Sequence, residues 1–135
     1  QGNANNLSFI KDESIDLICT HPPYADIIQY SIEIPGDISH LKYEDFLKEL
    51  EQVAKESYRV LKKQGICTFM IGDIRKKGYV LPLGMSSMQK FVDAGFKLKE
   101  IIIKEQHNCK ATEYWNNIEK TFLMLAHEYI FVLEK

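Results

Sequence analysis

The chain combines one long segment of helical periodicity with several short apolar runs. Apolar residues recur every three or four positions across residues 43–61, the spacing of one face of a helix. Gly65 is the expected cap beyond that helix, and a second helix is predicted over about 85–94, closed by Gly95. Runs without this period predict buried strands. They cover residues 15–20, 66–71, 98–103 and 121–133.

The predicted order is strand, helix, strand, helix, strand, loop, strand. Strands that alternate with helices indicate an α/β fold with right-handed crossovers and a mostly parallel sheet. The last two strands have no helix between them, so they are expected to pair antiparallel. Ligands of such sheets sit beyond the carboxyl ends of the strands. Those ends lie at residues 20–24, at 72–75 and in the loop after 103.

Composition fits one globular domain over residues 1–135. The chain is 45% hydrophobic and 27% charged, and it has no apolar run near the roughly 18–20 residues that cross a bilayer, so no membrane role is expected. Its three cysteines lack CxxC spacing, which predicts a reduced, cytoplasmic protein and no metal site. Cys19 and Cys67 are expected to be buried. The chain opens without methionine, so a fragment of a longer protein is expected.

Charge is unevenly distributed along the chain. Residues 59–110 carry 11 basic and 4 acidic side chains, whereas residues 1–58 carry 4 basic and 11 acidic ones. The basic middle could face a polyanion such as nucleic acid. Solvated lysines on helix and strand faces would give the same pattern. Charge therefore leaves both interpretations open.

The most informative stretch is Thr20-His21-Pro22-Pro23-Tyr24, at the end of the first predicted strand. Two prolines fix the backbone and remove two N–H donors, which leaves carbonyl groups free to accept hydrogen bonds. A polar side chain precedes them and an aromatic ring follows. Such acceptors can hold an exocyclic NH2 group, while the ring stacks on a base flipped out of a duplex. The stretch thus predicts methylation of an amine.

This stretch resembles motif IV of the S-adenosylmethionine-dependent DNA amino-methyltransferases, the adenine-N6 and cytosine-N4 family, in which Asp, Asn or Ser precedes Pro-Pro-Tyr. Gly2-Asn3-Ala4 resembles the family segment Gly-Asp-Ala before that motif, and residues 65–75 resemble its next strand, ending in Gly-Asp-x-Arg. Residues 127–132 resemble its final strand. Together these segments span nearly the whole chain. The resemblance implies a partial Rossmann-like methyltransferase fold that holds the acceptor half of the site.

The sequence departs from the family pattern at three places. His21 stands where the family has Asp, Asn or Ser, so the choice between adenine and cytosine stays open. Asn3 replaces the usual Asp. The seven glycines include no Gly-x-Gly pair, so the family's glycine-rich cofactor loop is missing. The chain alone is therefore expected to be inactive.

The resemblance implies a role for each candidate residue. His21, Pro22, Pro23 and Tyr24 would form the catalytic acceptor site. Thr20 would bind S-adenosylmethionine together with Asn3 and Ala4. Asp73 and Arg75 would contact the substrate.

DNA is the expected partner of the chain, which could also form a homo-oligomer through an exposed sheet edge. Alternative acceptors are RNA and the glutamine amide of a protein. A further alternative is a non-catalytic nucleic-acid-binding domain of the same fold.

Overall fold

The computed structural model describes residues 2–27, 29–31, 33–106 and 122–135. Two helices, six strands and two short 3-10 turns lie in these ranges. In chain order they are β1 (Ile15–Thr20), η1 (Ala25–Ile27), η2 (Ile38–His40), α1 (Tyr43–Val60), β2 (Leu61–Ile71), β3 (Ile74–Lys76), β4 (Tyr79–Leu81), α2 (Leu83–Asp93), β5 (Lys97–Glu105) and β6 (His127–Glu134). The predicted alternation of strands and helices is confirmed. In the described residues no helix is long and apolar enough to cross a membrane.

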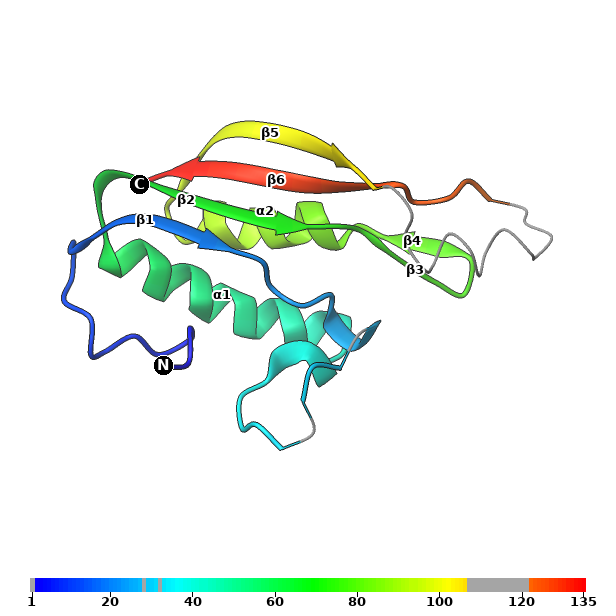
Figure 1. The fold of residues 1–135 in the computed structure, drawn as a ribbon, viewed down its shortest axis with the longest axis horizontal. Helices are drawn as coiled ribbons and strands as arrows, with labels where there is room; N and C mark the ends of the chain where they lie inside the picture. The colour runs from blue at the N-terminus through cyan, green and yellow to red at the C-terminus, as the bar shows by residue number, and fades with distance from the viewer. Residues whose placement is uncertain (1, 28, 32, 107–121) are drawn as a thin grey trace.

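Four strands form the main sheet in the order β1-β2-β6-β5 (Figure 1). β1 and β2 run parallel, and β6 runs antiparallel to both β2 and β5. Three strands therefore point one way, and the expected antiparallel pairing of the last two strands is confirmed. The sequence did not predict that β6 lies between β2 and β5. As an inner strand, β6 pairs on both edges, and its Phe131 and Leu133 are buried whereas Ile130 and Val132 are only partly buried.

Both helices pack on the same face of the sheet. The core between them is aromatic: Phe69 on β2 stacks on Phe91 of α2, with ring centroids 4.5 Å apart, and contacts Phe131 of β6 at 5.2 Å. α1 contributes Phe46 and Leu50, both essentially inaccessible to solvent. The opposite face is open, because on β1 Leu17 is 56% exposed.

Three sequence-based expectations are wrong. Gly65 is not a helix cap: α1 already ends at Val60, and Gly65 lies inside β2. The last strand begins at His127, so residues 122–126 precede it. Cys19 is exposed on the open face of the sheet, although Cys67 is buried as expected. In all three places a local apolar pattern extends beyond what tertiary packing uses.

The basic segment after β2 forms a hairpin of β3 and β4. Lys77 and Gly78 link the two strands with φ angles of 52° and 84°. Positive φ at both central residues matches the type I′ turn that suits the twist of a two-residue hairpin. The hairpin projects beyond the carboxyl end of β2 (Figure 1).

Candidate functional site

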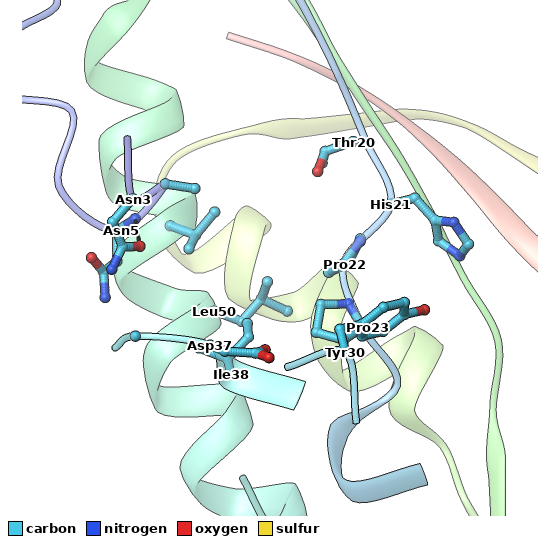
Figure 2. Close-up of a pocket in the computed structure, with 13 residues that line it drawn as sticks. Asn3, Asn5, Thr20, His21, Pro22, Pro23, Tyr30, Asp37, Ile38 and Leu50 are labelled. Atoms are coloured by element: carbon cyan, nitrogen blue, oxygen red, sulfur yellow. Dashed lines mark hydrogen bonds between the residues drawn. The ribbon is translucent and has the colours of Figure 1, made fainter. Parts of the chain in front are cut away.

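A cavity of about 360 Å³ lies beside the carboxyl end of β1, where the fold predicts a ligand site. Its walls come from the N-terminal segment, the end of β1, the loop before α1, and α1 itself (Figure 2). The lining residues are Asn3, Ala4, Asn5, Thr20, His21, Pro22, Pro23, Tyr30, Gly36, Asp37, Ile38, Leu50 and Val53. All three predicted cofactor-binding residues, Asn3, Ala4 and Thr20, are therefore brought together.

The N-terminal wall of the cavity is held against α1 by hydrogen bonds. Arg59 donates to the carbonyl oxygens of Leu7 and Ile10, at 2.8 and 3.0 Å, and pairs with Glu56 of its own helix. Asn5 donates to Glu49 Oε2 at 2.9 Å. Side chains of α1 thus bind a segment that lies more than 40 residues earlier in the sequence. These contacts position Asn3 and Ala4 across from β1.

The opposite wall is a tight turn at Gly36 and Asp37. Gly36 has φ +86°, a backbone conformation that favours glycine, and a Cβ there would come within 2.5 Å of Asn3 Nδ2 and displace that side chain. Asp37 accepts hydrogen bonds from the Ser39 N–H at 2.8 Å and from the Ser31 hydroxyl at 2.7 Å. The backbone bond of Ser39 and the side-chain bond of Ser31 lower the pKa of Asp37 to about 2. The cavity therefore carries a negative charge at neutral pH.

The His21 ring points away from the cavity and from Asn3, Asp37 and Leu50 (Figure 2). On that side its Nε2 lies 3.2 Å from the Tyr24 hydroxyl, and the two rings meet edge to face with centroids 5.6 Å apart. The Tyr24 hydroxyl donates a short hydrogen bond to Glu128 at the start of β6. Pro22 and Pro23 thus separate two surfaces, the cavity and an aromatic side.

Electrostatics on the aromatic side centre on Glu128. Its carboxylate accepts from Lys104 of β5 as well as from Tyr24, and only 6% of the residue is exposed. Burial raises its pKa, but the hydrogen bonds from Lys104 and Tyr24 outweigh this and leave the pKa below its ordinary value. Burial and the neighbouring carboxylate raise the pKa of Tyr24. Glu128 is therefore ionised and Tyr24 keeps its proton at neutral pH.

Asp73, predicted to contact the substrate, is occupied inside the fold. Its Oδ1 accepts from the Gly84 N–H at 2.9 Å, and its Oδ2 accepts from the Tyr129 hydroxyl at 3.2 Å. The first bond satisfies one of the free N–H groups at the start of α2. Asp73 does not line the cavity. Its contacts indicate that it fixes α2 to β6.

Arg75 also makes contacts within the chain. Its guanidinium donates to the carbonyl oxygens of Gly78 at 2.7 Å and Leu123 at 2.9 Å, and it lies 4.2 Å from the centroid of the Phe122 ring. These contacts attach the hairpin to the segment before β6. Substrate binding by Arg75 stays a prediction, with no support from this placement.

Sequence reasoning missed Asp37 and Glu128. The position of Asp37 in the cavity depends on its hydrogen bonds with Ser31 and Ser39, which no spacing rule encodes. Glu128 did leave a signal: it is a charged residue inside an otherwise apolar strand segment, which is rare unless the charge has a partner. That partner, Lys104, lies directly opposite it in the β5–β6 ladder.

Comparisons with known proteins agree with this geometry. A family model for DNA methylases, N6_N4_Mtase, matches residues 15–135. The type II methyltransferase M.MjaVI of Methanocaldococcus jannaschii is 30% identical over 132 residues, which cover 93% of this chain and 64% of that protein. The type II methyltransferase M.MthZI of Methanothermobacter thermautotrophicus is 27% identical, with 98% of this chain and 43% of that protein covered.

Solved structures give the same result. The candidate DNA modification methylase TTHA0409 of Thermus thermophilus, complexed with S-adenosyl-L-methionine, matches 99% of this chain and 53% of its own at 26% identity and a TM-score of 0.71. The cytosine-N4-specific PvuII DNA methyltransferase has a TM-score of 0.76 at 22% identity, a likeness of fold, with 98% of this chain and 47% of its own covered. The chain thus spans roughly half the length of most of these proteins. With its family model matched over nearly its whole length, the chain belongs to the DNA methylase family.

Proposed function

We propose that this chain is the acceptor half of a DNA amino-methyltransferase that transfers a methyl group from S-adenosylmethionine to N6 of adenine or N4 of cytosine. The observation that carries the proposal is the Thr20–Tyr24 segment, which divides a largely apolar cavity with a few polar groups from the aromatic side at the carboxyl end of β1. One side suits a methyl donor and the other a base. The family assignment and the DNA methyltransferases among its relatives support the same chemistry.

The cavity fits part of S-adenosylmethionine. Asn3, Thr20 and Asp37 provide hydrogen-bonding groups, Ile38, Leu50 and Val53 provide an apolar wall, and a volume of about 360 Å³ lies within the range of small-molecule sites. The ionised Asp37 also suits a ligand that carries positive charge. When bound, this cofactor supplies a sulfonium methyl group to the lone pair of an amine, and the electrons of the broken carbon–sulfur bond stay with sulfur.

The acceptor side depends on residues of this chain. The Pro22 carbonyl and the His21 ring accept hydrogen bonds from the NH2 group of the base, which orients its lone pair outward. Tyr24 offers a ring face for stacking, because its hydroxyl is anchored to Glu128 rather than pointing to solvent. The amine loses one proton after transfer, and water is its final acceptor.

A three-acceptor assay tests the proposal. Duplex DNA, tRNA and a glutamine-containing protein are each incubated with labelled S-adenosylmethionine and the complete natural polypeptide that carries this chain. The expected product is labelled N6-methyladenine or N4-methylcytosine in DNA, lost in Tyr24→Ala and His21→Ala and kept in the matched control Tyr43→Phe, whose hydroxyl contacts only Ser86 among the described residues. Methyl transfer only to tRNA or to protein would favour the alternative acceptors, and none at all would favour a binding domain.

Two further expectations stay predictions. A cytoplasmic location rests on the absence of CxxC spacing among the cysteines. Self-association would use the unpaired edge of β1 or β5, the two outer strands of the described sheet.

A further inference from the structure

A continuous series of hydrogen-bonded polar groups runs from β5 to the His21 ring. Lys104 pairs with Glu128, Glu128 accepts from the Tyr24 hydroxyl, and the Tyr24 oxygen lies 3.2 Å from His21 Nε2. The first pair is fixed by the sheet, since Lys104 and Glu128 are direct partners in the β5–β6 ladder. This series of polar groups ends at His21, the residue that replaces the family's Asp, Asn or Ser.

The hydrogens available along this series of polar groups determine whether Nε2 of His21 carries one. The Tyr24 hydroxyl has a single hydrogen, which it donates in the hydrogen bond to Glu128, because an ionised carboxylate can only accept hydrogen bonds. The Tyr24 oxygen then has only lone pairs to offer to His21. A close contact between this oxygen and Nε2 is favourable only when Nε2 carries a hydrogen.

We propose that Glu128, acting through the Tyr24 hydroxyl, fixes the neutral His21 ring in the tautomer with its hydrogen on Nε2, so that Nδ1 is the acceptor offered to the target amine. Glu128 is thus a positioning residue. Its use toward an amine rests on the proposed function, whereas the tautomer itself does not. The proposal also explains how histidine can stand where the family has an oxygen acceptor, since a neutral imidazole has only one accepting nitrogen.

Two further observations support this arrangement. His21 is exposed, and no hydrogen bond within the described part of the chain occupies Nδ1, so this nitrogen is available to a ligand. At Gly72, an added Cβ would lie 3.2 Å from Tyr24 Cε1 and 3.4 Å from Glu128 Cγ. The missing side chain therefore leaves room for Tyr24 and Glu128 to meet beside the end of β2.

Nuclear magnetic resonance of the 15N-histidine-labelled chain tests the tautomer without any turnover. Spectra that correlate ring carbon-bound protons with ring nitrogens distinguish Nε2–H from Nδ1–H. They are recorded at a pH at which imidazole is neutral, and the His21 signals are identified by their loss in His21→Ala. The parent is expected to show His21 only as Nε2–H. In Glu128→Ala the freed Tyr24 proton can turn toward Nε2, so the Nδ1–H form is expected to appear.

The matched control is Glu134→Ala. Glu134 lies on the same strand and pairs with Lys99 of β5 at 2.5 Å, but it is remote from Tyr24 in the sheet. It is expected to leave the His21 signals unchanged. Tyr24→Phe provides a second variant, which keeps the ring, removes only the hydroxyl and is expected to give a mixture of both tautomers. Thermal unfolding verifies that each variant is folded.

The outcomes separate this inference from the proposed function. His21 found as Nδ1–H in the parent, or unchanged by both Glu128→Ala and Tyr24→Phe, would overturn the positioning role. Titration with deoxyadenosine and deoxycytidine monophosphates then tests the use of Nδ1, whose 15N resonance is expected to shift with one of them. If the variants change the His21 tautomer as expected but neither nucleotide shifts the Nδ1 resonance, the positioning role of Glu128 is supported and the acceptor role of His21 toward DNA bases is overturned.

Discussion

The contacts of Asp73 give a sharp test of whether this residue binds substrate or holds the fold. Asp73→Ala removes the acceptor of the Gly84 N–H, which lies in the buried first turn of α2, and the acceptor of the Tyr129 hydroxyl. Loss of a helix-capping acceptor costs about 0.5–2 kcal/mol. An ordinary hydrogen bond to the hydroxyl contributes about 0.5–1.5 kcal/mol.

The free energy of unfolding is therefore expected to fall by about 2 kcal/mol in Asp73→Ala, since both bonds are lost together. For a chain of this length each kcal/mol shifts the midpoint of thermal unfolding by about 3–5 °C, so the midpoint should fall by about 6–10 °C. Asp73→Asn keeps an oxygen for the Gly84 N–H and should lose less than half as much. Urea unfolding measures the change in free energy and thermal unfolding the change in midpoint, both followed by circular dichroism without any ligand.

The matched control for Asp73 is Asp93→Ala at the other end of α2. Asp93 is exposed and accepts only from the Gln89 side chain among the described residues, at 2.8 Å. Its replacement should change the free energy of unfolding by no more than about 0.5 kcal/mol. The structural interpretation of Asp73 would be refuted if Asp73→Ala unfolded like the parent while binding of DNA was lost.

Three further predictions concern ionisable groups. Because the pKa of Asp37 is lowered from 3.8 to about 2, its ionised form stabilises the fold above pH 3.8, and this stabilisation is lost as the pH falls toward 2. In acid unfolding, Asp37→Asn should therefore lose less stability over this pH range than the parent. Because the pKa of Tyr24 is raised above its ordinary value of 10.0, its contribution is present below pH 10.0 and lost at higher pH; Tyr24→Phe should weaken the alkaline loss of stability. Burial raises the pKa of the Cys67 thiol to about 12, so iodoacetamide at neutral pH should label exposed Cys19 and leave Cys67 unlabelled until the chain is unfolded, as mass spectrometry of peptides would report.

Much of the fold could be predicted because its signals are local. The spacing of Phe46, Leu50 and Ala54 identifies α1, and Pro22 and Pro23 mark the end of β1. The insertion of β6 between β2 and β5 could not be predicted, since it depends on pairing between residues more than 50 positions apart in the case of β2. Periodicity identifies strands but not their neighbours.

The candidate site also has a part that could be predicted from local sequence and a part that could not. The motif at residues 20–24 predicted its location, and the structure brings Asn3, Ala4 and Thr20 to one cavity there. The contacts of Asp73 with Gly84 and Tyr129 could not be predicted, because a carboxylate after a strand has the same sequence appearance whether it binds a ligand or caps a helix. Glu128 acquires its role only through Tyr24, 104 positions earlier in the sequence.

In the proposed function, the Thr20–Tyr24 segment presents a DNA base amine to S-adenosylmethionine. The most direct test is nucleoside mass spectrometry of duplex DNA after incubation with isotope-labelled S-adenosylmethionine and the complete natural polypeptide that carries this chain. Labelled N6-methyladenine or N4-methylcytosine is expected, absent with Tyr24→Ala and retained with Tyr43→Phe. Unlabelled DNA beside labelled tRNA or protein, or equal labelling by the parent and Tyr24→Ala, would contradict it.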